Sequence, residues 1–302
     1  MIKYNRNFIL NKKIIISTIS IILLIHSIPS FSQLLPSNYF YSNSYYNMLP
    51  HNAAYAGQDS FSIAVSGFAE TSYFQFKENE FETGYRGAQF NISTNLKKLH
   101  SAIGVVAEAS GSGGDDIYFA SIKEYVLGIV YNFNIKVNDK SNLRIGTRIN
   151  KNKREASSSN FSTITIDPAI WYARERWSAG ISLKNITNEE NLSQEIEFDS
   201  WFKLLQKNDT KLVGVFNICH SISDNEVNEY RFIPQVNLET AKVLLFNLSY
   251  IRYIYDYKMK DHKDIIIVGA GIKCSPKVKL MLNYFGNDKY NKEISMMLKC
   301  DF

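Results

Sequence analysis

The sequence is poor in cysteine: among 302 residues it has only Cys219, Cys274 and Cys300. An odd number of cysteines without a CxxC spacing predicts neither a disulfide framework nor a zinc site. Cys219 and Cys300 both fall at strand positions, where a cysteine behaves as a small apolar side chain. We therefore interpret all three as structural and expect no metal and no cofactor.

Long apolar runs are absent after the first 32 residues. No run of about 18 apolar residues occurs there, which excludes a transmembrane helix in that part of the chain. If the chain spans a membrane, it must do so as a closed β-barrel, because only that alternative satisfies every backbone group inside the bilayer.

An excess of charge of one sign is also absent. The whole chain has 34 basic and 29 acidic residues, but four of the basic residues lie near the N-terminus, at Lys3, Arg6, Lys12 and Lys13. Without them the balance is 30 against 29, a net charge of +1. The sequence pI of 8.8 therefore gives no reason to expect a nucleic-acid partner.

The N-terminal residues have the three parts of a secretory signal peptide. The four basic residues precede a mostly apolar run over 14–28, and small residues then occur at Ser30 and Ser32, three and one before Gln33. We predict cleavage between Ser32 and Gln33. The apolar run is short and interrupted for a permanent membrane anchor, and no cysteine follows it that could carry a lipid.

The rest of the chain divides into two parts. Residues 33–60 are rich in Tyr, Asn and Ser without clear periodicity, so we predict an irregular segment or plug ahead of the strands. Residues 61–302 contain recurrent segments of about ten alternating residues separated by turn residues, the pattern of a sandwich or barrel. The expected organisation is a signal peptide at 1–32, the irregular segment at 33–60, and an all-β barrel at 61–302.

Alternation alone does not say which face points inward. A soluble barrel of lipocalin type places its apolar face inside, whereas a membrane barrel places it outside. Cationic residues that stand among glycines and asparagines favour a water-filled lumen; they are Arg144, Arg148, Lys277 and Lys279. The signal peptide also favours a membrane barrel, because it directs the chain through the inner membrane. Aromatic residues near strand ends fit an interfacial girdle, although core packing is the alternative; they are Tyr131, Phe133, Trp171, Tyr172, Trp177, Tyr250, Tyr253, Tyr255, Tyr284 and Phe285.

The strand count follows from these segments. About thirteen alternate clearly, and since bacterial barrels have an even number we predict an antiparallel transmembrane barrel of fourteen strands, with twelve as the fallback. Residues 243–263 are where we expect the uncounted strand.

Loop lengths predict the orientation, because periplasmic turns are short and outer loops long. Residues 138–140 and 174–176 are predicted tight turns. Residues 108–121 and 187–210 are predicted outer loops, the second with one helical turn around Trp201, Leu204 and Leu205.

Two stretches invite a catalytic or ligand-binding interpretation. Residues 111–116 read Gly-Ser-Gly-Gly-Asp-Asp but lack the Lys-Ser/Thr and the helix pattern of a phosphate-binding loop, so an outer loop is favoured. His220 and Ser221 are similar to a pair used by barrel esterases that act on lipid A, but no acid is placed beside them. We predict no catalytic residue and no enzymatic activity.

The last strand, 292–302, alternates up to the final residue. Its apolar positions include Ile294, Met296 and Phe302 on one face. In a closed barrel this edge pairs with the first strand, so we assign Phe302 to barrel assembly and closure.

One hexapeptide stands before the first strand: Asn52, Ala53, Ala54, Tyr55, Ala56 and Gly57. Small residues allow close backbone approach, asparagine tolerates turn geometry, and Tyr55 supplies an anchor, so the segment could pin the N-terminal part inside or under the barrel. A plain turn into the first strand is the alternative.

This hexapeptide resembles the Asn-Pro-Ala-Tyr-Ala-Gly signature of the PorP/SprF family, outer-membrane proteins of the type IX secretion system in Bacteroidota. The match departs at Ala53, where the family has proline, so the turn is expected to be less rigid. Gln33, the strand–turn–strand of 171–185 and the terminal 298–302 also resemble family features in family order. The resemblance extends over nearly the whole mature chain.

The resemblance implies a non-enzymatic barrel in the outer membrane that supports secretion or surface attachment of a large adhesin-type cargo, including gliding-motility adhesins. Implied partners are outer-membrane lipid, a cargo with a type IX C-terminal domain, and periplasmic secretion or gliding components. The hexapeptide and the lumen-facing Arg144 and Arg148 are the candidate contact residues. A general transporter or porin of fatty-acid-channel type is the alternative function.

Overall fold

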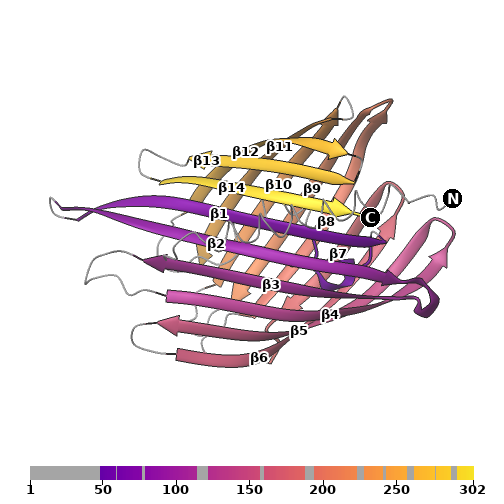
Figure 1. The fold of residues 1–302 in the computed structure, drawn as a ribbon, viewed down its shortest axis with the longest axis horizontal. Coiled ribbons are helices and arrows are strands. Elements are labelled where there is room, and N and C mark those ends of the chain that lie inside the picture. Colours follow the sequence, from indigo (N-terminus) through magenta and orange to yellow (C-terminus); the bar gives the residue numbers. More distant parts are fainter. Residues whose placement is uncertain are drawn as a thin grey trace, which may run out of the picture. The chain divides into compact units, whose positions relative to one another are not determined.

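Fourteen antiparallel strands form a closed barrel in the computed structural model (Figure 1). The structure describes residues 48–58, 60–76, 79–113, 122–156, 160–187, 194–222, 228–240, 243–256, 262–275, 277–286 and 291–302. Each strand pairs with its neighbours in sequence, and β1 pairs with β14 to close the ring. Within these residues no helix is both long and apolar enough to span a bilayer.

Most strands are as long as tilted membrane-spanning strands need to be, about 9–11 residues or more, whereas β7 has 8. Their bounds are β1 Phe61–Phe76, β2 Asn79–Leu96, β3 Ser101–Gly113, β4 Ile122–Asn138, β5 Ser141–Ala156, β6 Asn160–Arg174, β7 Trp177–Lys184, β8 Gln194–Lys207, β9 Thr210–Ile222, β10 Asn228–Thr240, β11 Leu244–Asp256, β12 His262–Ser275, β13 Val278–Gly286 and β14 Asn291–Asp301. Two short 3-10 helices, η1 Ala53–Tyr55 and η2 Lys97–Leu99, complete the described elements.

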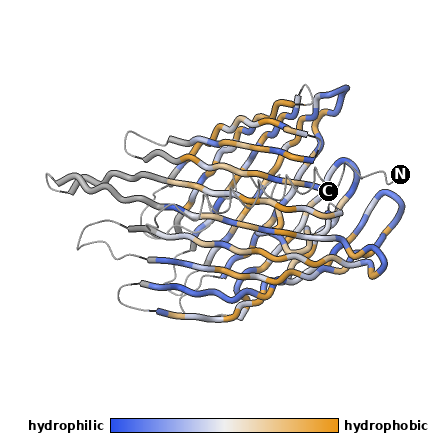
Figure 2. The backbone as a smooth tube through the Cα atoms, in the orientation of Figure 1, coloured by the Kyte–Doolittle hydropathy of each residue, from blue (hydrophilic) through white to orange (hydrophobic). Residues whose placement is uncertain are grey.

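The apolar face of the strands points outward. In β4, Leu127 and Ile129 are 55% and 67% exposed, whereas the intervening Gly128 and the nearby Asn132 are buried. Hydrophobic and hydrophilic residues alternate along the tube in Figure 2. The lumen face carries the buried charged and amide side chains, so the predicted inside-polar, outside-apolar barrel is confirmed, and the lipocalin-type alternative is excluded.

The predicted number of strands is confirmed, but the uncounted strand lies elsewhere than expected. Residues 243–263 contain β11 and the start of β12, while residues 187–210, predicted as an outer loop, contain β8. The predicted helical turn there is wrong, since Trp201, Leu204 and Leu205 are strand residues. A register shift between Lys203 and Leu205 interrupts the alternation and leaves Leu204 and Leu205 both exposed, which hides this strand from the periodicity.

The predicted loop at 108–121 is also partly wrong. Strand β3 continues to Gly113, so residues 108–113 belong to the barrel wall and residues 114–121 lie outside the described residues. The Gly-rich stretch that begins at Gly111 is therefore in part a strand.

Six short connections between described strands lie at one end of the barrel, which we call the tight-turn end. They join β2 to β3, β4 to β5, β6 to β7, β8 to β9, β10 to β11, and β12 to β13. The predicted turns at 138–140 and 174–176 are two of them, with residues 139–140 and 175–176 between the strands. The predicted signal peptide at 1–32 and most of the predicted segment at 33–60 lie outside the described residues.

The predicted aromatic girdle is only partly correct. Tyr131, Phe133 and Tyr284 are 49%, 45% and 49% exposed, as expected of the outer face, but Trp171 and Tyr253 are buried on the lumen side. Proximity to a strand end thus does not distinguish a lipid-facing aromatic from a luminal one. Two further members of the predicted girdle have side chains outside the described part of the chain, namely Tyr255 and Phe285.

One of the four cations predicted to line the lumen lies elsewhere. Arg144 and Arg148 are buried on the lumen face of β5. Lys277 is instead exposed in the turn before β13, because the strand begins one residue later than the alternation suggests.

The barrel closes where β1 meets β14. Their register extends from Ser62 opposite Asp301 to Ser72 opposite Asn291. Beyond the last strand residue, the Phe302 N–H donates a 2.7 Å hydrogen bond to the Phe61 carbonyl, and the two rings lie 5.6 Å apart.

Candidate functional site

Residues 48–57, which we call the luminal segment, lie against the inner face of the barrel. Its 3-10 turn η1 contacts β4, β5 and β6. Met48, Ala53, Ala54 and Ala56 are almost completely buried, in one apolar cluster with Trp171 of β6. The hexapeptide singled out in the sequence forms the second half of this segment.

The luminal segment has a tight local fold. The Asn52 side chain caps η1 by accepting a 3.0 Å hydrogen bond from the Ala54 N–H. Ala53 occupies the first helical position after this cap, where a proline loses no helical hydrogen bond, and Asn52 is extended as a residue before proline must be. The backbone here therefore accommodates either alanine or proline. Gly57 ends the segment with φ of +68°, which favours glycine.

Barrel side chains donate hydrogen bonds to the carbonyl oxygens of the luminal segment. The Asn132 amide reaches the carbonyls of Ala54 at 3.0 Å and Ala56 at 2.7 Å. A segment without strand pairing leaves carbonyls unsatisfied, and burial of such groups is costly unless side chains supply the donors. Three further donors do so: Arg148 Nη1 to Pro50 at 3.0 Å, Ser182 Oγ to His51 at 2.8 Å, and Asn95 Nδ2 to Gly57 at 3.2 Å.

Two glycines of the wall allow the segment to approach the barrel closely. A Cβ on Gly146 of β5 would lie 2.8 Å from the Ala54 backbone nitrogen and Cα. A Cβ on Gly180 of β7 would overlap the Trp171 ring and lie 2.8 Å from the Asn52 amide nitrogen. Small residues on both sides of this contact are therefore a steric requirement.

Tyr55 supplies the aromatic contact expected of it. Its ring meets the Trp171 ring edge-on, with centroids 5.4 Å apart and planes at 90°. This geometry is favourable for aromatic pairs, and among the described residues Trp171 is the largest side chain that is fully buried.

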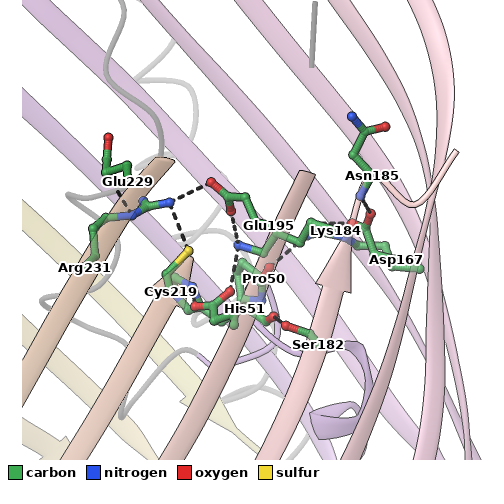
Figure 3. A network of polar contacts seen from close by, with 12 residues as sticks. Pro50, His51, Asp167, Ser182, Lys184, Asn185, Glu195, Cys219, Glu229 and Arg231 are labelled. Carbon is green, nitrogen blue, oxygen red and sulfur yellow. Dashed lines mark hydrogen bonds and ion pairs between the residues drawn. The ribbon is translucent and has the colours of Figure 1, made fainter. Parts of the chain in front are cut away.

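An ionic network surrounds the other half of the luminal segment (Figure 3). Arg148 of β5 pairs with Asp167 of β6 at 2.8 Å and lies 3.6 Å from Glu108 of β3. Asp167 also accepts hydrogen bonds from the Asn150 amide at 2.6 Å and from the Asn185 backbone N–H at 2.8 Å. Arg148 thus connects the backbone of the luminal segment, at Pro50, to the Asp167 carboxylate. That carboxylate is held in addition by Asn150 and Asn185.

The network continues over β7, β8 and β10. Glu197 is fully buried between Lys184 Nζ at 2.7 Å and His51 Nδ1 of the luminal segment at 3.2 Å. Lys184 also reaches Glu195 at 3.3 Å, and Glu195 pairs with Arg231 at 2.6 Å. Buried charges are tolerated when they are paired in this way, and the pairs join the luminal segment to the barrel wall through His51.

The predicted site residues have different places in this arrangement. Asn52 to Gly57 lie in the luminal segment, and Arg148 contacts it directly. Arg144 is buried on the same lumen face of β5, about 13 Å further along the strand. Phe302 lies at the closing seam between β14 and β1, where it contacts Phe61.

The sequence pattern does not reveal several residues that hold the segment or belong to the network around it. They are Asn95, Asn132, Asp167, Ser182, Lys184, Glu195, Glu197 and Arg231. Most of them carry no sequence signal beyond being polar residues on the inward face of an alternating strand, and Glu195 and Glu197 lack even that, because the sequence predicts a loop where β8 lies. That pattern marks a lumen lining but does not show which side chains meet the luminal segment.

The predicted weakness of the His220–Ser221 pair has a geometric basis. Adjacent residues of β9 point to opposite faces of the barrel wall. His220 stacks on Tyr230 of the neighbouring strand with ring centroids 4.3 Å apart. Within the described part of the chain, the His220 Nε2 atom has no hydrogen-bond partner.

Comparison with solved structures identifies proteins of the same fold. A FadL homologue from Pseudomonas aeruginosa is 8% identical, with a TM-score of 0.55 over 83% of this chain and 92% of that one. The monoaromatic hydrocarbon channel TodX, as a deletion mutant, gives 7% identity and a TM-score of 0.57 over 82% and 92%. The monoaromatic hydrocarbon channel CymD is 9% identical, with a TM-score of 0.53 over 86% of this chain and 93% of that one. At these identities the likeness concerns the fold alone.

Comparison by sequence gives a family. No curated protein matches the chain. Residues 36–301 match the family described as type IX secretion system membrane protein PorP/SprF, a range that includes the luminal segment and all fourteen strands. The chain therefore belongs to the PorP/SprF family and is an outer-membrane β-barrel.

Proposed function

We propose that this barrel supports the secretion, or the attachment to the cell surface, of a large adhesin-type cargo by the type IX system. The cargo's C-terminal domain is held by the barrel lumen or its outer loops, and periplasmic secretion or gliding components contact the opposite end. The protein acts without catalysis. Membership of a secretion-system family over residues 36–301 is the observation that carries this proposal.

The position of the luminal segment favours a barrel that holds a cargo domain over a channel through which solutes diffuse. Carbonyl contacts from Asn132, Arg148 and Ser182 fix the segment against the wall, and His51 joins it to the buried Glu197. We propose that residues 33–60 form a plug or periplasmic lead-in, of which the luminal segment is the anchored part. Arg144 and Arg148 are then polar contacts of the lumen, and Phe302 serves barrel closure.

Deletion of the gene tests this proposal. Surface proteins are labelled with a membrane-impermeant biotin reagent in the parent, the deletion strain and the complemented strain, and are then quantified by mass spectrometry. We expect a very large adhesin to be lost from the surface in the deletion strain and restored by the wild-type gene. Unchanged surface proteins in the deletion strain would contradict the proposal.

Solute uptake separates this function from its competitor, a general transporter of fatty-acid-channel type. The mature protein is reconstituted in liposomes and compared with a variant lacking residues 48–57. A barrel anchored by its own segment should admit little solute, and the deletion variant more. Rapid uptake by the wild-type barrel would favour the transporter instead.

A further inference from the structure

Three lysines form a row across neighbouring strands on the lumen face. Lys273 of β12 lies opposite Lys279 of β13, which in turn lies opposite Lys299 of β14. Lys279 and Lys299 share their inward alternation with Met281 and Met297, which are fully buried. We call these three residues the lysine row.

Acidic side chains contact the lysine row. Glu239 lies 2.5 Å from Lys273 Nζ and 3.8 Å from Lys279 Nζ, and Asp301 lies 3.2 Å from Lys299 Nζ. A fourth lysine, Lys211 of β9, interacts electrostatically with Lys279 and Glu239. Like charges directly opposed across strands repel each other, and Glu239 and Asp301 offset part of this repulsion.

The surroundings of the row add to its positive charge. Within three residues of a tight turn or of Phe302, the described chain has twelve basic residues, namely Lys97, Lys98, Lys136, Lys140, Arg174, Arg176, Lys207, Lys211, Lys273, Lys277, Lys279 and Lys299. The same positions hold five acidic residues, which are Asp139, Glu175, Asp209, Glu239 and Asp301. This end of the barrel wall is therefore basic.

The luminal segment, residues 48–57, contains no acidic residue. Residues 1–58 contain neither Asp nor Glu, and Asp59 is the first acidic residue of the sequence. The luminal segment, which fills part of the lumen, thus brings no carboxylate that would offset the basic end.

The position and length of the lysine row indicate which class of ligand it would bind. The three side chains point into the lumen, whereas lipid headgroups border the outer wall, so a lipid phosphate is disfavoured. Strands lie about 4.8 Å apart, so the row extends over about 10 Å, which is longer than a single phosphate and matches about three residues of extended chain. We propose that the lysine row binds an extended acidic segment of a partner protein that enters the lumen from the tight-turn end.

This inference deepens the proposed function, on which it rests for the identity of the partner as a secretion component or cargo. Its own content is the chemistry of that partner: consecutive Asp or Glu residues whose carboxylates pair with Lys273, Lys279 and Lys299. Lys273 and Lys279 are partly buried and Lys299 is buried. Burial strengthens such pairs because charges are screened less there than in water.

Peptide binding to the purified mature protein in phosphatidylcholine nanodiscs tests the site. The probe is fluorescein-labelled hexaglutamate, followed by fluorescence anisotropy, with hexalysine as the opposite-charge peptide. The variant K273Q/K279Q/K299Q is compared with K97Q/K98Q/K140Q, which removes three exposed lysines of the same end. We expect hexaglutamate binding to weaken about tenfold or more in the first variant and less than about twofold in the second.

The outcomes separate the possible origins of binding. Equal weakening in both triple variants, or displacement of the peptide by inorganic phosphate at the same concentration as by free hexaglutamate, would overturn the peptide site. So would absence of binding to the wild-type barrel. Heat-modifiable migration of each variant on gels shows that the barrel has folded.

A single substitution keeps the proposal testable if the triple variant fails to fold. Lys279→Met removes the middle charge and leaves Glu239 paired with Lys273. We expect the denaturation midpoint to be unchanged or higher, because repulsion is relieved, while peptide binding weakens. A lower midpoint with unchanged binding would show that the row serves structure. Full surface display by the triple variant, in a strain whose deletion abolishes display, would overturn this inference and leave the proposed function standing.

Discussion

At the scale of single residues, backbone carbonyls account for most of the polar contacts that hold the luminal segment. Asn132, Arg148 and Ser182 all donate to carbonyl oxygens, and these exist whatever side chains the segment carries. Side-chain requirements are steric at Ala53, Ala54 and Gly57 and aromatic at Tyr55. Polar side chains act at His51, which pairs with Glu197, and at Asn52, which caps η1. This division explains why a short motif of small residues around one tyrosine is a recognisable sequence feature.

Arg148 is the residue whose loss should cost most. Arg148→Gln leaves Asp167 buried without its cation and removes the donor to the Pro50 carbonyl, so we expect a loss of about 3 kcal/mol in unfolding free energy. Lys153→Gln on the same strand removes only an exposed ion pair with Glu155, so the unfolding free energy should hardly change. Denaturant titration in detergent micelles, followed by tryptophan fluorescence, measures both.

The double variant R148Q/D167N provides the internal check. Removing the carboxylate charge as well should recover part of the stability lost in Arg148→Gln, because an amide is less costly to bury than an unpaired anion. If the double variant loses as much unfolding free energy as the two single variants together, Arg148 and Asp167 do not stabilise the barrel as an ion pair.

Gly146 should be intolerant of even one methyl group. Gly146→Ala places a Cβ about 2.8 Å from the Ala54 backbone, so we expect the luminal segment to detach from the wall and become accessible to protease. Gly67→Ala is the matched control, since its Cβ would make only an ordinary 3.5 Å contact with the Gly87 carbonyl. Limited proteolysis with N-terminal sequencing of the fragments distinguishes them; equal protection in both variants would refute the tight approach.

At the scale of elements, some strands are predictable from the sequence because their alternation is unbroken. Strands β4 and β5 alternate over most of their length, and the outward set of β4, including Leu127 and Ile129, is the one expected. Strand β8 escapes the pattern because a register shift near Lys203 disturbs the alternation and because Glu197 and Asp199 on its inward face resemble loop residues. A luminal strand with buried acids has no distinct signature in a single sequence.

The luminal site shows the same limit. The hexapeptide is recognisable from its residue types, and Arg148 from its place on an alternating strand. Asp167, Lys184 and Glu197 are not, since they come from β6, β7 and β8 and meet only when the barrel closes around the segment. Long-range pairing of this kind has no local sequence pattern.

The closing seam gives a prediction for one element, β14. Phe302→Ala removes the ring contact with Phe61 while keeping the backbone bond, so we expect a smaller folded fraction after refolding into micelles. Phe133→Ala, a lipid-facing aromatic away from the seam and 45% exposed, should fold nearly as well as the parent. Heat-modifiable gel migration measures the folded fraction, and equal yields would remove Phe302 from any part in closure.

At the scale of the whole molecule, the outward apolar surface makes a depth-dependent prediction. Ile129→Arg places a cation near the middle of β4 on the lipid face and should destabilise the barrel by about 2–4 kcal/mol in bilayers. Ile135→Arg, on the same face but close to the tight-turn end, should cost about 0–1 kcal/mol. Unfolding in lipid vesicles measures both. Equal costs, or a costless Ile129→Arg, would contradict membrane insertion with this face outward.

The seam between β1 and β14 has a further consequence for how the polypeptide matures. Its hydrogen bonds join residues such as Ser62 and Asp301, which are encoded at nearly opposite ends of the barrel-forming region. The native ring cannot close while β14 is missing, so a prematurely ended polypeptide lacks the native partner of β1 and exposes unpaired strand edges. Incomplete products should therefore remain substrates for periplasmic chaperones and proteases, and only full-length polypeptide should accumulate in the membrane.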